Sequence, residues 1–103
     1  MITFQYFKDC PHSAETLRNL LELAKDNQIP ENEVHVIEVP DPASAEEHQF
    51  QGSPTILVDG VDIVTLKKPE GFNYACRIYE FNGTRTGVIP KEYIESRLRE
   101  LRG

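Results

Sequence analysis

The chain has only two cysteines, Cys10 and Cys76, among its 103 residues. Two thiols are too few for the disulfide framework that stabilises many small secreted domains. In a reducing compartment, a cysteine that matters is more often catalytic, redox-sensing or metal-binding than part of a structural disulfide. The two thiols are therefore the first candidates for a functional site.

Long apolar runs and an excess of basic residues are also missing. No run approaches the roughly 20 apolar residues of a membrane-spanning helix, so we expect no membrane partner. The first residues lack the basic segment, apolar stretch and cleavage site of a signal peptide, which predicts a cytoplasmic location. The 17 acidic residues outnumber the 11 basic ones. Because contacts to phosphates need a basic face, we expect no nucleic-acid partner.

The length and composition predict one globular domain over residues 1–103. Hydrophobic residues make up 39% of the chain and charged residues 27%, which is typical of folded domains. No internal repeat or low-complexity segment divides the sequence. We expect a monomer or a weak dimer.

Changes in hydrophobic periodicity predict the order of the elements. Residues 2–7 alternate as a strand, residues from 11 to about 26 follow a helical period, and residues 33–39 form a second strand. A strand, a helix and a strand in this order predict two parallel strands.

The second half of the chain predicts antiparallel strands and a closing helix. Asp59-Gly60 separates two apolar runs, 55–58 and 61–64, and is a strong hairpin signal. Asn82-Gly83 predicts a further short ribbon, and Pro90 stands where a last helix begins. A short helix is expected after residue 41, with Asp41 or Ser44 as its cap.

Cys10 lies at the junction of the first strand and the first helix. If Pro11 is the first helical residue, Cys10 is the N-cap, and its sulfur faces the N–H groups of His12 and Ser13. The helix dipole then favours the thiolate, the Ser13 side chain donates to the sulfur, and a protonated His12 adds positive charge. The alternative for Cys10 is a buried cysteine without chemistry.

The combination of Cys10-Pro11-His12-Ser13 with Gly52-Ser53-Pro54-Thr55 resembles the thioredoxin/glutaredoxin superfamily. The first motif is similar to the C-P-H-C site of periplasmic disulfide oxidases with serine replacing the second cysteine, as in monothiol glutaredoxins. Small bacterial thioredoxin-like proteins of unassigned function also look similar in the segment around Cys76. The resemblance implies a thioredoxin-like α/β fold, with a mixed four-stranded sheet flanked by helices.

The resemblance also implies roles for the residues of both motifs. Cys10 would be the thiolate of a thiol-disulfide oxidoreductase, tuned by His12 and Ser13, with no cofactor but with glutathione as a candidate co-substrate. Pro54 would be a cis-proline beside Cys10. The residues expected to hold the backbone of a protein or glutathione disulfide are Pro11, Ser53, Pro54 and Thr55.

Cys76 leaves several alternatives open. If the long connection from residue 65 to 89 folds over the helix start, Cys76 is a resolving thiol or a second soft-metal ligand. The organomercurial lyase core, which is also thioredoxin-like and has two separated cysteines, gives the metal alternative some weight. A third alternative is an idle interaction module that keeps the fold without the chemistry.

The remaining polar residues give weaker signals. His35 and His48 are expected to be structural or surface residues, and no His or Cys pair has zinc-like spacing. His12 is expected to be exposed on its helix. A last group could bind an anionic carboxylate but is more simply solvated: Lys67, Lys68, Arg77 and Tyr79.

Overall fold

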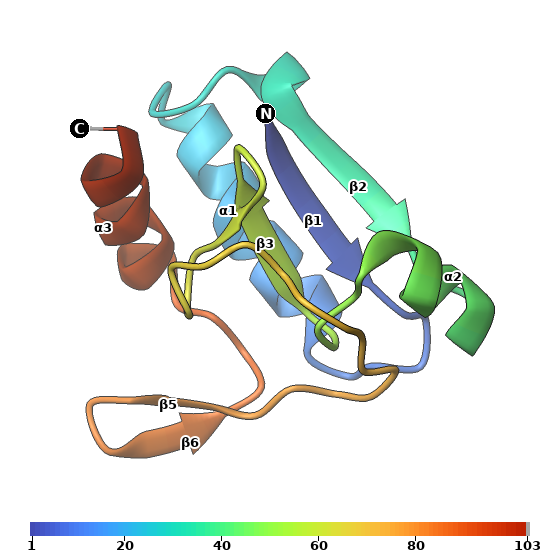
Figure 1. Ribbon diagram of the computed structural model, residues 1–103. Helices are drawn as coiled ribbons and strands as arrows, with labels where there is room; N and C mark the ends of the chain where they lie inside the picture. Colours follow the sequence, from blue (N-terminus) through green and yellow to red (C-terminus); the bar gives the residue numbers. More distant parts are fainter. Residues whose placement is uncertain (103) are drawn as a thin grey trace.

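Strand β1 (Ile2–Tyr6) lies between two other strands of the main sheet (Figure 1). In the computed structural model, which describes residues 1–102, the strand order is β2-β1-β3-β4. β2 (Val34–Glu38) is parallel to β1, and β3 (Thr55–Val58) and β4 (Val61–Asp62) follow as antiparallel neighbours. The predicted mixed four-stranded α/β sheet is confirmed.

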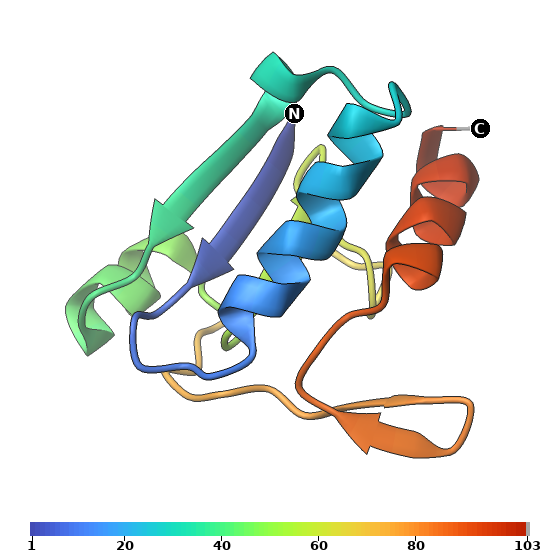
Figure 2. The same ribbon diagram turned by 180° about the vertical axis from the view of Figure 1, so that it is seen from behind.

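One face of the sheet is covered by the two longer helices (Figures 1 and 2). α1 (Ser13–Lys25) and α3 (Lys91–Arg102) pack on the side chains that alternate to this face of β1 and β3. The largest fully buried residues of this core are apolar: Ile2, Phe4, Leu20, Leu23, Ile56, Ile63, Ile89 and Ile94. Removal of this apolar surface from water is the main stabilising term of the fold.

A second, smaller core lies at the end of the sheet near α2 (Pro42–His48). Val39, Ala45 and Phe50 are buried there, with Phe7 and Tyr74 packed against them. The Asp41 side chain accepts a hydrogen bond from the Ser44 N–H at 2.8 Å, which confirms the predicted cap. Tyr74 belongs to the long segment that crosses the sheet on the face opposite α1 (Figure 1).

Both predicted hairpin turns are present. Asp59 and Gly60 have φ values of 52° and 87°, and Asn82 and Gly83 have 53° and 81°, as a type I′ turn requires. The second turn joins β5 (Tyr79–Phe81) to β6 (Thr84–Thr86) in a separate two-stranded ribbon.

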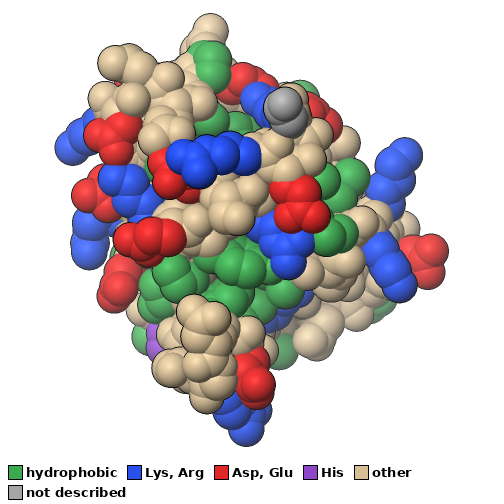
Figure 3. All heavy atoms as spheres, turned by 90° about the vertical axis from the view of Figure 1, so that its left-hand side faces the viewer, with side chains coloured by type: hydrophobic (Ala, Val, Ile, Leu, Met, Phe, Trp, Pro, Cys, Tyr) green, Lys and Arg blue, Asp and Glu red, His purple; other side chains and the backbone are tan. Residues whose placement is uncertain are grey.

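The β5–β6 ribbon is attached to α3 by aromatic contacts. The Phe81 and Tyr93 ring centroids are 4.5 Å apart, and Phe81 also stacks on Tyr79. Figure 3 shows the side of the molecule that carries α3 and the ribbon, where charged side chains of both signs surround a small group of hydrophobic ones. The ribbon is therefore part of the packed structure although it does not join the main sheet.

Strand β4 is shorter than predicted. The apolar run predicts a strand over residues 61–64, but β4 ends at Asp62. The Asp62 carboxylate accepts hydrogen bonds from the N–H groups of Val64 and Thr65, at 2.8 and 3.3 Å. These bonds turn the chain away from the sheet directly after Asp62.

The start of α1 also differs from the prediction. His12, not Cys10, is the N-cap, and its side chain makes no cap hydrogen bond. The Thr16 N–H bonds to the His12 carbonyl at 3.3 Å, so Pro11 lies in a turn that precedes the helix. Cys10 consequently lies three residues before the first helical residue.

The expectation that His12 is exposed is wrong. The residue is half-buried because Gly87, in the connection between the ribbon and α3, packs against its imidazole. A Cβ atom added to Gly87 would lie only 2.0 Å from Cδ2 of His12. This contact fixes the ribbon connection over the start of α1.

Gly87→Ala tests this contact. We expect the free energy of unfolding to fall by about 1–3 kcal/mol, because the added methyl group forces His12 out of its place. Urea denaturation of the single variant and of Gly87→Ala in a His12→Ala background gives the measurement. The loss should be much smaller in the second background, and equal losses would contradict the proposed clash.

Candidate functional site

The Cys10 sulfur lies against the main chain that precedes Pro54. Its thiol donates to the Ser53 carbonyl at 3.5 Å, and Cys10 is only 5% exposed. The turn that carries it is closed by a hydrogen bond from the Cys10 N–H to the Phe7 carbonyl, at 3.1 Å. The Ser53–Pro54 peptide bond is cis, as the resemblance implied. The first strand and the Ser53–Pro54 loop therefore meet at this sulfur.

Residues 75–77, which we call the strap, lie beside the same loop. The Ser53 N–H donates to the Ala75 carbonyl and the Arg77 N–H donates to the Ser53 carbonyl, both at 2.8 Å. These two bonds pair Cys76 with Ser53 in an isolated parallel bridge. The structure thus brings together two cysteines that are 66 positions apart in the sequence.

Cys10 affects the ionisation of Cys76. Desolvation of the Cys76 thiol, then its polar contact with Cys10 and the charge on Cys10, raise the pKa of Cys76 to about 11. Cys76 is nevertheless exposed as a whole residue, and both cysteines are free thiols. At neutral pH, Cys76 is consequently protonated.

The other residues of the first motif surround Cys10 without contacting its sulfur through hydrogen bonds. The Ser13 hydroxyl donates to the Cys10 carbonyl at 3.1 Å, whereas the sequence predicted a bond to the sulfur. Ser13 is buried, and Pro11 is exposed. This difference follows from the later start of α1, which turns the Ser13 side chain toward the main chain of the preceding turn.

The strap is anchored by Arg77. Its guanidinium bonds to the Asp62 carboxylate at 2.7 Å and to the Thr55 hydroxyl at 3.1 Å, and it lies over the Tyr79 ring at 4.6 Å. The Asp62 side chain is 2% exposed. The expectation that Arg77 is solvated or binds an external carboxylate is therefore wrong, because a buried carboxylate of the chain itself occupies it.

Gly52 makes room for this anchor. Its φ is +114°, which side chains rarely allow, and an added Cβ would lie 2.4 Å from Cγ of Arg77. Sequence reasoning did not find Asp62. The available signal was a charged residue within an otherwise apolar predicted strand, which is unusual unless the charge is paired.

The residues predicted to bind a partner's backbone are engaged within the chain. Both main-chain polar groups of Ser53 bond to the strap. The Pro54 carbonyl accepts the Tyr79 hydroxyl, and the Thr55 hydroxyl donates to the Gly52 carbonyl. Tyr79 is buried, and burial is the main cause that raises the pKa of its hydroxyl. The loop around Pro54 is thus held on two sides by residues 75–79.

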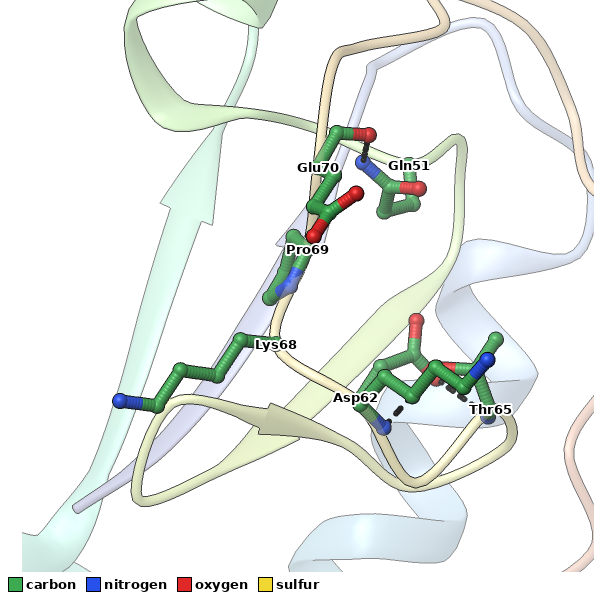
Figure 4. A pocket seen from close by; sticks show the side chains of 7 residues that line it. Gln51, Asp62, Thr65, Lys68, Pro69 and Glu70 are labelled. Carbon is green, nitrogen blue, oxygen red and sulfur yellow. Dashed lines mark hydrogen bonds between the residues drawn. The ribbon is translucent and has the colours of Figure 1, made fainter.

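Two pockets lie near these elements. One, of about 480 Å³, is lined by Cys10 and by mostly apolar neighbours: Phe4, Tyr6, Lys8, Pro11, Ser13, Ala14 and Leu17. The other, of about 500 Å³, contains neither cysteine and is polar (Figure 4). Gln51 donates there to the Glu70 carbonyl, and the Lys68 side chain points away from the other residues. Of these two pockets, only the first adjoins a cysteine, which is Cys10.

The chain matches no protein-family model, no curated protein and no solved structure. Membership of the thioredoxin-like superfamily therefore stays a prediction. Within residues 1–102, no helix combines the length and apolar character needed to cross a membrane. In the same part of the chain, no three His, Cys, Asp or Glu side chains cluster as metal ligands.

Removing the strap's anchor tests its contribution to stability. Arg77→Met should lower the free energy of unfolding by about 3–5 kcal/mol, because it leaves the Asp62 carboxylate buried without its partner. Urea denaturation measures the change. The Arg77→Met, Asp62→Asn double variant should recover part of the loss, since no charge is then buried. A loss below about 1 kcal/mol for Arg77→Met would show that the pair behaves as an exposed one.

The effect of Cys10 on the pKa of Cys76 predicts how the reactivity of the Cys76 thiol depends on pH. Cys10→Ala removes two of the three causes that raise the pKa of Cys76, so the thiolate fraction at a given pH should increase. We expect faster alkylation of Cys76 by iodoacetamide at pH 8 than in the wild type, followed by mass spectrometry. In urea, both proteins should alkylate Cys76 at the same rate. An unchanged alkylation rate in the folded variant would contradict this effect of Cys10 on the pKa of Cys76.

Proposed function

We propose that the protein is a thiol-disulfide oxidoreductase in which Cys10 and Cys76 form a reversible redox pair. The observation that carries this proposal is the position of Cys76 opposite Ser53, whose carbonyl accepts the Cys10 thiol. The sequence motif alone offers one cysteine and a serine. The strap adds the second cysteine that a dithiol reaction needs.

The arrangement of elements supports a thioredoxin-like protein as the proposed family. A strand leads to Cys10, a helix follows, a parallel strand comes next, and a cis Ser53–Pro54 bond opens an antiparallel hairpin. We retain the cytoplasm as the proposed location and no cofactor as the expectation. Glutathione stays the candidate co-substrate.

The reaction needs only the two cysteine thiols and the substrate disulfide. The Cys10 and Cys76 thiols lose two protons and two electrons and form one S–S bond, while the substrate disulfide accepts both and becomes two thiols. Cys10 supplies a thiolate that attacks a sulfur atom. Ser13 holds the main chain of Cys10, and His12, two residues after Cys10, is the N-cap of α1.

The same pair of sulfurs supports a second candidate function, the binding of a soft cation. Thiolates select ions such as Cu(I) or Hg(II), and two neighbouring cysteines would suit a cation that accepts two sulfur ligands. A metal bound at a ratio of one per chain would protect both thiols from alkylation together. An idle module would show neither this protection nor disulfide formation.

Oxidation of the folded protein tests the redox pair. Excess glutathione disulfide at pH 8 should yield one intramolecular link between Cys10 and Cys76, identified by peptide mapping under non-reducing conditions. Cys10→Ser and Cys76→Ser should each prevent this link, and a chelator in all samples excludes metal-catalysed oxidation. Wild-type protein with both thiols free after this treatment would refute the proposal.

A further inference from the structure

The two thiols of the proposed pair differ in their access to solvent. Cys10 is 5% exposed, and its sulfur bonds to the Ser53 carbonyl, which also accepts the Arg77 N–H of the strap. Cys76 lies in the strap itself and is exposed. Thiol-disulfide exchange requires an attacking sulfur to reach the disulfide sulfur directly, so access decides which atom reacts with an external partner.

Several contacts hold the strap in its position beside Cys10. Both main-chain polar groups of Ser53 bond to it, and Arg77 holds it to the buried Asp62 carboxylate. Displacing the strap would leave that carboxylate unpaired in the interior, which is strongly unfavourable. The close approach of Arg77 to Gly52 further limits its movement. The position of the strap beside Cys10 is therefore a stable feature of the fold.

The same contacts restrict the class of partner. An extended peptide that adds to a strand needs free main-chain N–H and C=O groups. Both groups of Ser53 are used by Ala75 and Arg77, so the chain's own strap fills the position beside Cys10. A peptide consequently gains no main-chain binding to Ser53, whereas a small disulfide needs only to reach Cys76, which is an exposed residue.

We propose that Cys76, not Cys10, exchanges with the external sulfur, and that the partner is a small thiol or disulfide of the glutathione class. This inference rests on the proposed redox pair and reverses the order of attack that the sequence suggests. Cys10 then reacts only with the sulfur of Cys76.

In the reducing direction, an external thiolate attacks Sγ of Cys76 in the Cys10–Cys76 disulfide. The S–S bond between the cysteines breaks, Cys10 leaves as a thiolate and takes up a proton, and a mixed disulfide remains on Cys76. A second external thiol attacks the external sulfur of this mixed disulfide, which frees Cys76 and releases the external disulfide. Two external thiols are oxidised and the protein disulfide is reduced to two thiols.

The raised pKa of Cys76 affects the two directions differently. In the reducing direction Cys76 is the sulfur under attack and does not have to ionise. In the oxidising direction the Cys76 thiolate attacks the external disulfide and releases one external thiol, and the Cys10 thiolate then attacks Sγ of Cys76 in the mixed disulfide and releases the second. Because Cys76 must lose its proton for the first of these steps, its raised pKa makes oxidation faster at higher pH.

Single-cysteine variants identify the entry sulfur. Cys10→Ser and Cys76→Ser, each shown to be folded by circular dichroism, are incubated with glutathione disulfide at pH 8, and adducts are followed by intact mass. We expect Cys10→Ser to gain its adduct on Cys76 roughly tenfold or more faster than Cys76→Ser gains one on Cys10. In urea the difference should disappear, because both sulfurs are then exposed.

An adduct that forms as fast on Cys10 would overturn the inference and would indicate entry through the pocket beside Tyr6 and Leu17. This failure is distinct from that of the redox pair, which the wild-type mapping experiment tests separately.

A disulfide-linked peptide dimer tests the partner class. The oxidation rate of the wild type should rise linearly with peptide concentration, and saturation at low concentration would contradict the exclusion of peptides.

Discussion

The hydrogen bonds of Ser53 connect the parts of the molecule on which the candidate site depends. Its hydroxyl accepts the Phe7 N–H at the end of β1, its N–H bonds to Ala75, and its carbonyl accepts both Arg77 and the Cys10 thiol. Ser53 is fully buried, so each of these groups would be costly to leave without a partner. One residue thus fixes the first strand, the first cysteine and the strap relative to one another.

A second interaction, the ion pair of Arg77 with the buried Asp62 carboxylate, holds the strap in position. Asp62 ends β4 through its bonds to Val64 and Thr65, and the same carboxylate holds Arg77 across Gly52. A charge that shortens one strand is therefore also the charge that positions Cys76. This link between sheet and strap brings the exposed Cys76 to the loop that contacts the buried Cys10.

Much of the fold could be predicted because it depends on local patterns. Alternation identified β1, the Asp59-Gly60 and Asn82-Gly83 pairs identified both hairpin turns, and Asp41 capped its helix as expected. The start of α1 was misplaced, because Pro11 is compatible with a preceding turn as well as with a first helical residue. The length of β4 was misjudged because hydrophobic pattern does not reveal the side-chain bonds of Asp62.

The sequence by itself determined the order of strands and helices and identified Cys10 as the first candidate, since periodicity and turn residues act over short distances. Only the tertiary structure decided that Cys76 lies opposite Ser53, that Arg77 pairs with Asp62, and that Cys10 is the covered thiol. Arg77 itself is half-buried, and only its partner carboxylate, Asp62, is fully enclosed. These features arise from contacts between residues far apart in the chain, which require the packed sheet to exist before they can form. No local pattern around Cys76 encodes its neighbour.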